Sequence, residues 1–189
     1  MSEAQLTKKA LAEALMALCR EKPYEKISVQ ELTKHAQLNR QTFYYHFPDK
    51  QALLQWTYEN QALHFLADEV TTIDNWEEQA LKMLKAITAE EAFYTSSVKA
   101  DQQVLATTFS EIIQGLFIRL FEQMDIEKQL LAEDKEFYAR FFSYGCSGVL
   151  LNWIVKGYQE PPLIIATQLF RLAKDIEFFA YRLYTEQEE

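Results

Sequence analysis

The stretch Ser28–Lys50, SVQELTKHAQLNRQTFYYHFPDK, constrains this chain more than any other. Ser28 is a good helix N-cap, and Glu31 three residues later completes a capping box. Asn39 offers a second N-cap, and Pro48 ends the helix that follows it. Two short helices joined by a tight turn are the pattern of a helix-turn-helix, which places its second helix in the major groove of DNA.

The second short helix has one aromatic face and one polar face. Phe43 and Phe47 are four residues apart and share the side that packs inward. The opposite side offers hydrogen-bonding groups from Arg40, Gln41, Thr42, Tyr44, Tyr45 and His46. Arg suits guanine, Gln suits adenine, and the Thr methyl group suits thymine, so base reading is the prediction. An ordinary solvated helix face is the alternative.

These residues also carry a resemblance to a known family. The run Ala36–Leu54, AQLNRQTFYYHFPDKQALL, resembles the helix-turn-helix of TetR-type transcriptional regulators, and the similarity extends from about Leu6 to Leu54. Gln37 departs from the family, which usually has Gly in the turn. A side chain in a left-handed turn costs about 1 kcal/mol, which a packed domain can absorb.

The resemblance implies a set of DNA contacts. Tyr44 and Lys50 fall on family positions that contact phosphates, and Tyr45 and His46 could join them, although His46 could instead pack under the following turn. Ser28 opens a helix whose N–H groups favour a phosphate, so we expect it to be both cap and phosphate ligand. The expected DNA-binding residues are Ser28, Asn39, Arg40, Gln41, Thr42, Tyr44, Tyr45, His46 and Lys50.

Composition favours an all-α protein that touches DNA at one end. Of the 189 residues, 49% are hydrophobic and only four are Gly and four Pro, which suits long helices joined by short turns. The net charge is −9, but residues 1–50 hold eight Lys or Arg against six Asp or Glu. A head at +2 therefore sits on a body at −11, which argues against coating of DNA and favours a few well-placed contacts.

Several other classes of protein are disfavoured. Cys19 and Cys146 show no disulfide or zinc spacing, and the N-terminus does not resemble a signal peptide. The apolar run Phe141–Val155 is shorter than a membrane span, so a soluble cytoplasmic protein is expected. No catalytic constellation or phosphate loop is present, which predicts a protein that is not an enzyme and needs no cofactor.

We expect two domains, a three-helix helix-turn-helix head over residues 1–48 and an effector-binding and dimerisation body over residues 49–189. A helix over residues 3–21 should brace the head. The helix that follows Pro48, expected over residues 49–70, is apolar on several sides and is the natural lever between head and body. Helices opened by Asp74 and by Thr88 should follow, then long helices over 101–124 and 135–157, with a bend between them.

The last two predicted helices are residues 135–157 and a helix that starts at Pro161 and Pro162. They expose more apolar surface than one small body can cover. Two such hairpins pairing about a two-fold axis would form a four-helix bundle, which is also how TetR-type regulators dimerise. The residues expected at this interface are Gly145, Gly148, Leu169, Leu172 and Ile176.

Aromatic residues in the body indicate either an effector cavity or a solid core. The candidate lining is Phe65, Phe109, Phe117, Tyr144 and Trp153. The run Phe141–Gly157 resembles a TetR subgroup that includes regulators of dihydroxyacetone-kinase operons, some of which act through a partner protein rather than a small ligand. Both kinds of effector therefore remain open.

A metal site is not expected, because His35, His46, His64 and Cys19 match no metal-binding spacing. The sequence thus predicts a homodimeric, sequence-specific DNA-binding regulator of a near-palindromic operator, modulated by an effector in the body. An all-α ligand- or protein-interaction module without DNA binding is the alternative.

Overall fold

The computed structural model describes residues 2–67, 71–72, 75–124 and 131–172. Within these residues it contains helices and no strand, as the composition predicts. The elements are α1 (Glu3–Glu21), the 3-10 turn η1 (Tyr24–Lys26), α2 (Val29–His35), α3 (Arg40–His46), α4 (Lys50–Tyr58), the π-helical turn η2 (Glu59–Leu63), α5 (His64–Ala67), α6 (Trp76–Ala89), α7 (Glu91–Ala100), α8 (Gln102–Met124) and α9 (Ala132–Val155). A further helix, Pro162–Leu172, follows α9.

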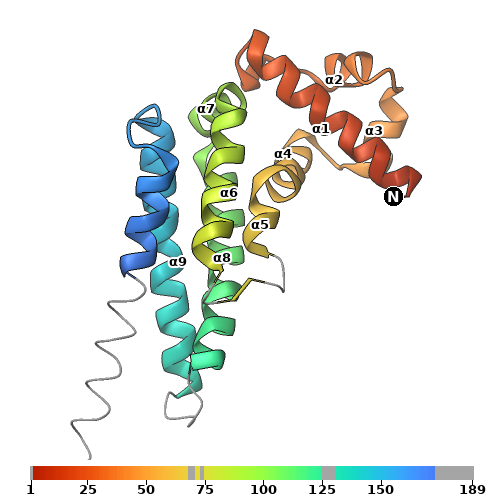
Figure 1. Ribbon diagram of the computed structural model, residues 1–189. Helices are drawn as coiled ribbons and strands as arrows, with labels where there is room; N and C mark the ends of the chain where they lie inside the picture. Colours follow the sequence, from red (N-terminus) through yellow and green to blue (C-terminus); the bar gives the residue numbers. More distant parts are fainter. Residues whose placement is uncertain (1, 68–70, 73–74, 125–130, 173–189) are drawn as a thin grey trace, which may run out of the picture.

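The helices form a small head and a longer body (Figure 1). Helices α1, α2 and α3 lie together at one end, while α8 and α9 run side by side along the long axis of the body. Helices α4 and α5 lie between the two parts, and α4 packs on both α1 and α8. The segment Pro162–Leu172 returns beside the body, where Phe170 contacts Trp76 of α6.

The turn between α2 and α3 has the left-handed geometry expected at Gln37, whose φ is 56°. The amide of Leu38 donates to the carbonyl of Thr33 at 2.8 Å, and the amide of Gln37 donates to Lys34 at 3.2 Å. These two bonds define a Schellman motif, which fixes where α2 stops and α3 begins. Gln37 occupies the position where Gly is usual, so the strain expected at this residue is present.

The expected 49–70 helix is present through Ala67 and contains a π-helical turn. Helix α4 passes into the π-helical turn η2 and then into α5, which ends at Ala67; residues 68–70 lie outside the described part. Leu53, Leu54 and Tyr58 are fully buried, so the segment is packed on several sides as its composition predicts. A single extra residue in a helical turn shifts the faces that follow it, and such turns are frequent at functional sites.

Head and body are also joined through α7, which the sequence did not indicate. One guanidinium nitrogen of Arg20, Nη2, lies 2.7 Å from both carboxylate oxygens of Glu90 at the start of α7. The amide of Tyr24 donates to the Ser96 hydroxyl at 2.8 Å. The orientation of the head therefore depends on two attachments, the α4–α5 lever and this contact with α7.

One of the predicted helix starts is wrong. Thr88 does not cap a new helix; its hydroxyl bonds back to carbonyls of Leu84 and Lys85 within α6, and α7 begins at Glu91. Helix α6 begins at Trp76 after Asn75, whereas Asp74 lies outside the described residues. The predicted stop at Gly157 is confirmed, since Gly157 has φ 74° and a Schellman motif closes α9.

One described helix, Gln102–Gln123, is long and apolar enough to cross a membrane, but 56% of its most apolar window is buried inside the fold. That burial is typical of the central helix of a packed body. It explains the high apolar content of α8 without a lipid environment.

Candidate nucleic-acid interface

Helix α3 is held rigidly by its cap and its inward face. The Asn39 side chain accepts from the Thr42 amide at 2.7 Å and from the Thr42 hydroxyl at 3.0 Å. Phe43 is fully buried, and Phe47 beyond the end of the helix is nearly so. A seven-residue helix is too short to be stable alone, so these contacts keep its outer face in one orientation.

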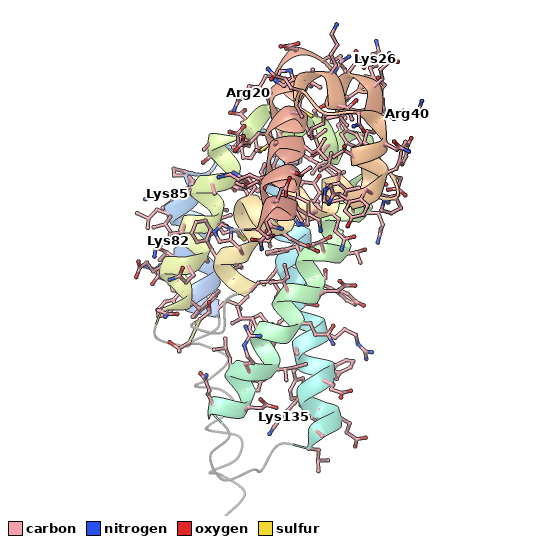
Figure 2. All side chains as sticks on the ribbon, turned by 90° about the vertical axis from the view of Figure 1, so that its right-hand side faces the viewer. Arg20, Lys26, Arg40, Lys82, Lys85 and Lys135 are labelled. Carbon is pink, nitrogen blue, oxygen red and sulfur yellow. The ribbon has the colours of Figure 1, made fainter. Side chains whose placement is uncertain are left out.

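The outer face of α3 is open to solvent. Arg40, Gln41, Tyr44 and Tyr45 are exposed, and Tyr45 reaches 84% exposure. Arg40 donates to the Tyr44 hydroxyl at 3.3 Å and lies over its ring. Arg40 and Lys26 project from the same outer end of the head (Figure 2). The residues predicted to read bases therefore share an accessible surface, although their contacts with DNA remain a prediction.

The residues at the edge of this surface differ in how far their polar groups already have partners within the protein. Ser28 is exposed and forms the predicted capping box with Glu31. The Glu31 carboxylate also pairs with Lys22, and these hydrogen bonds lower the pKa of Glu31 to about 2. His46 is half-buried and its ring contacts Tyr45 edge-on, so both interpretations of His46 stay open.

Lys50 is turned toward the protein. Its ammonium donates to the carbonyls of Tyr24 and Ile27, both at 2.9 Å, and lies over the Tyr24 ring. Partial burial lowers the pKa of Lys50. Two of its three N–H donors are thus used to join the start of α4 to the segment before α2, which leaves one donor for the phosphate contact predicted at this position.

The five candidate effector residues differ in how deeply they are buried. Phe109, Phe117 and Trp153 are buried, and Phe65 is half-buried. The indole N–H of Trp153 donates to the Glu160 carbonyl at 2.9 Å, which fixes the ring near the C-terminal end of α9. Tyr144 is 63% exposed on the outside of α9, so its assignment to an inner cavity is wrong. Helical spacing could not reveal this, because α9 carries apolar residues on more than one face.

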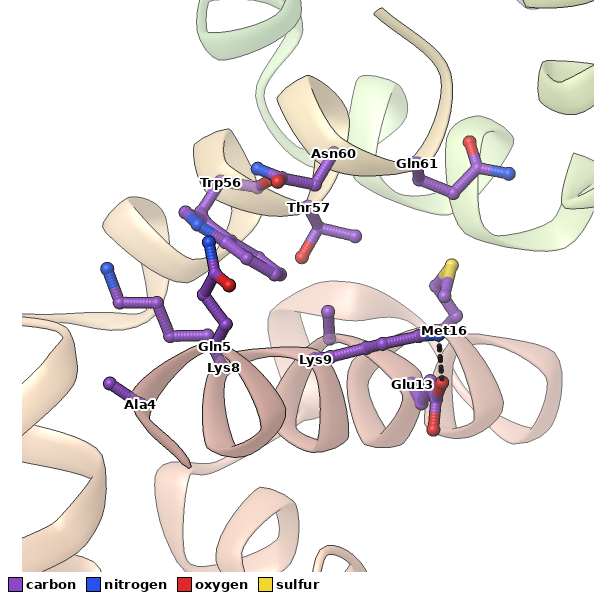
Figure 3. Close-up of a pocket in the computed structure, with 11 residues that line it drawn as sticks. Ala4, Gln5, Lys8, Lys9, Glu13, Met16, Trp56, Thr57, Asn60 and Gln61 are labelled. Carbon is purple, nitrogen blue, oxygen red and sulfur yellow. Dashed lines mark hydrogen bonds and ion pairs between the residues drawn. The ribbon is translucent and has the colours of Figure 1, made fainter. Parts of the chain in front are cut away.

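A cleft lies between the head and the lever (Figure 3). It has a volume of about 570 Å³ between α1 and α4, and it continues to η2. Trp56 and Met16 project into it, Lys8 and Lys9 lie at its α1 side, and Asn60 follows on η2. A second cleft of about 370 Å³ separates α4 from α8. Neither cleft is lined by the five predicted effector residues.

The outer face of α9 is apolar and uncovered. Phe137, Phe141, Tyr144 and Val155 are all exposed at helical spacing. Gly145 and Gly148 lie on the exposed side of the helix, and a Cβ built on either would meet nothing within 4 Å. Leu172 is exposed and Leu169 is half-buried, whereas Ile176 lies outside the described residues. An apolar stripe of this length is typical of an interaction surface.

The cysteines have no reactive environment. Burial raises the pKa of Cys19 to about 12 and that of Cys146 to about 11, so both remain thiols near neutral pH. Within the described ranges no three His, Cys, Asp or Glu side chains gather in a metal-binding cluster.

Sequence reasoning missed the contacts that join distant segments. The Arg20–Glu90 pair spans 70 residues, and the Tyr24–Ser96 bond spans 72. It also missed the half-buried Arg119, whose Nε and Nη2 are excluded from solvent and find no partner in the described structure. An Arg in the apolar run of α8, between Ile118 and Leu120, was the available signal for the latter.

Comparison with known proteins assigns both parts of the chain. Residues 11–55 match the model for bacterial regulatory proteins of the tetR family, and residues 74–175 match a transcriptional regulator C-terminal region. The chain is 30% identical over 94 residues to DhaS of Lactococcus lactis, the HTH-type dhaKLM operon transcriptional activator, and this match covers 50% of each chain. It is 23% identical over 174 residues to YxbF of Bacillus subtilis, an uncharacterised HTH-type regulator, covering 87% of this chain and 44% of that protein. The chain thus spans about half the length of the curated relatives it matches.

Solved structures agree in fold. The dihydroxyacetone kinase operon activator DhaS superposes with a TM-score of 0.71 at 22% identity, over 92% of this chain and 97% of that one. The FadR repressor of Thermus thermophilus, solved with lauroyl-CoA, gives a TM-score of 0.57 at 15% identity, over 87% and 92%. With the helix-turn-helix geometry of α2 and α3, these matches lead to one conclusion. The chain belongs to the TetR family of bacterial transcriptional regulators.

Proposed function

We propose that this regulator is a cytoplasmic homodimer that binds a near-palindromic operator through α3 and is switched by an effector in its body. The head is residues 1–48 and the body residues 49–189. The observation that carries the proposal is the outer face of α3, where exposed donors and acceptors stand on a short helix fixed by the Asn39 cap and by Phe43. Base reading requires this combination of exposed polar groups and a fixed backbone.

The uncovered stripe on α9 supports the dimer. Phe137, Phe141, Tyr144 and Gly148 succeed one another at intervals of four, three and four residues, which is the spacing of a helix seam. Leu163, Ile164 and Leu172 are exposed on the helix that follows. Pairing the two helices with their copies buries these side chains in a four-helix bundle. The two α3 helices then enter successive major grooves, about 34 Å apart along the operator.

The attachments between head and body support the switch. An effector that moves the α4–α5 lever or α7 changes the relative orientation of two heads in a dimer, and only one spacing fits the operator. Coupling of this kind is typically worth about 1–3 kcal/mol, or roughly 5- to 150-fold in affinity. The neighbour FadR is a repressor solved in complex with lauroyl-CoA, so a small molecule fits the role of effector. The resemblance of the Phe141–Gly157 run keeps a protein effector open as well.

Fluorescence anisotropy with DNA from directly upstream of the gene tests the proposal. The wild type should bind this fragment more tightly than a scrambled one, with an even number of subunits per site. Arg40→Ala should weaken specific binding by about 1–3 kcal/mol. Lys85→Ala is the matched control, because Lys85 is an exposed cation on α6 away from the head (Figure 2).

Salt dependence separates the outcomes. Phosphate contacts make binding fall steeply with salt for any DNA, whereas base reading preserves a difference between fragments. Equal binding to both fragments, or an Arg40→Ala variant as tight as the Lys85→Ala control, would refute sequence reading by α3. Absence of DNA binding at low salt would favour the interaction module.

A further inference from the structure

One edge of the Arg119 guanidinium on α8 is buried without a partner. Nε and Nη2 are both excluded from solvent, and among the described residues neither of them donates a hydrogen bond. Nε and Nη2 carry two parallel N–H groups, whose spacing matches the two oxygens of a carboxylate or a phosphate. The unpaired atoms are therefore a complete bidentate fork, not a stray donor.

Such a fork cannot relieve its burial by losing its charge. Guanidinium stays protonated in proteins, so the alternative of neutralisation open to Lys or Glu does not exist for Arg119. Arg119 as a whole is half-buried, but leaving two buried N–H groups of an ion without an acceptor is unfavourable. An anionic acceptor on the fork would remove this cost.

The nearest acidic residues of α8 do not supply that acceptor. Glu111 and Glu122 are both exposed, and no described carboxylate accepts from the two fork nitrogens. Glu122 is three residues from Arg119, a spacing at which an ion pair forms easily when the side chains point the same way.

The position of Arg119 places the fork on the side of α8 that faces the lever. Thr108 lines the cleft between α4 and α8, and Arg119 is eleven residues further on, which is three helical turns along the same face. Helix α5 also packs on α8. The α9 side of α8 is different, since Phe117 and Phe121 contact Phe142 there.

The guanidinium lies back along α8 toward the head. Nη1 is 3.8 Å from the place where a Cβ on Gly115 would be, so the side chain covers the preceding turn. The neighbouring residues Leu116 and Leu120 are buried in the core. An anion held by the fork would thus be at the edge of an apolar region, on the same face of α8 as Thr108.

We propose that Arg119 anchors the effector through an anionic group, a carboxylate or a phosphate, on the lever-facing flank of α8. This inference rests on the proposed function, because it identifies the chemical class of the effector bound in the body. It predicts that neutral and cationic molecules are not the natural effector. It also identifies the body residue that distinguishes an anionic effector from a neutral one of the same shape.

Thermal unfolding of the full chain tests the proposal with simple anions as probes. Wild type and Arg119→Met are compared in chloride, in inorganic phosphate and in acetate at equal ionic strength. In chloride, Arg119→Met should melt above the wild type, because methionine fills the site without an unpaired charge. Phosphate or acetate should raise the thermal unfolding midpoint of the wild type. The difference in midpoint between Arg119→Met and the wild type should therefore narrow or reverse. Arg171→Met, which removes an exposed arginine from the last described helix, measures the general effect of each salt.

The proposal stands only if both results are obtained. An Arg119→Met variant that melts below the wild type would show that the chain itself pairs with the fork in solution, and would overturn it. Identical anion responses in wild type, Arg119→Met and Arg171→Met would also overturn it. Operator binding by the same variants separates the two proposals: an anion response that needs Arg119 in a protein that binds no DNA would refute the regulator and leave the anion site intact.

Discussion

The contact between Arg20 and Glu90 provides a measurable estimate of how firmly the head is held. Nη2 of Arg20 is 2.7 Å from both oxygens of Glu90, the Arg20 side chain is 58% exposed and the Glu90 side chain is 19% exposed. Exposed pairs contribute about 0.2–1 kcal/mol, and short charge-assisted bonds to a largely covered carboxylate belong at the upper end. We therefore expect an interaction energy of about 1 kcal/mol.

A double-mutant cycle measures this energy directly. Arg20→Ala, Glu90→Ala and the double variant are unfolded in urea, and the non-additive part of the three free energies is the interaction. The Lys9–Glu13 pair on α1, at 3.9 Å with both side chains about 60% exposed, is the matched control and should give almost nothing.

The same cycle constrains the switch. If the contact holds the head in its binding orientation, Arg20→Ala should weaken operator binding by no more than the interaction energy, which is about fivefold for 1 kcal/mol. An interaction energy below about 0.2 kcal/mol, together with unchanged operator affinity, would refute the idea that the Arg20–Glu90 pair holds the head in its binding orientation. A much larger loss of affinity would show that Arg20 acts by some other route.

Three further predictions concern the turn, the α9 stripe and the buried thiol. Gln37→Gly should stabilise the fold by about 0.5–1 kcal/mol. A left-handed residue with a Cβ costs about 1–2 kcal/mol, and the greater entropy of Gly in the unfolded chain cancels part of the gain. Gly157→Ala should destabilise the fold, because Gly157 has φ 74°, and urea denaturation measures both variants. Phe141→Glu should weaken dimerisation by about 2 kcal/mol or more, whereas Leu6→Glu, at an exposed site on α1, should leave the dimer intact. Analytical sedimentation measures both variants, and a Phe141→Glu variant that stays dimeric would contradict the role of the α9 stripe. Cys19 should resist a thiol reagent at pH 8 in the folded protein, because its pKa of about 12 leaves the thiolate unpopulated until far higher pH; fast labelling without unfolding would contradict its burial.

The local features of this protein follow from its sequence. Ser28 and Asn39 fix the starts of α2 and α3 by accepting hydrogen bonds from amides three residues later. Pro48 disfavours helical backbone at Phe47, where α3 stops, so the helix-turn-helix could be predicted without a structure. Phe43 is buried while Tyr45 is exposed because the 3.6-residue period of a helix assigns each to a face. The stop at Gly157 belongs to the same class, since a left-handed residue closes the helix locally.

Where the local sequence is compatible with more than one structure, the tertiary packing selects one of them. Thr88 could cap a new helix or bond back into α6, and the packing of α7 on α1 selects the second. Tyr144 and Phe142 lie on the same apolar helix, yet contact with α8 buries one side and leaves the other uncovered.

The contacts most relevant to function have the same origin. Arg20 meets Glu90, Lys50 meets the carbonyls of Tyr24 and Ile27, and the fork of Arg119 is sealed from water, only because helices distant in sequence pack together. The sequence determined that the chain is helical and begins with a helix-turn-helix head, since helix caps and hydrophobic periodicity act over a few residues. The tertiary structure decided how that head is attached and which charge is left without a partner, because burial depends on the whole chain.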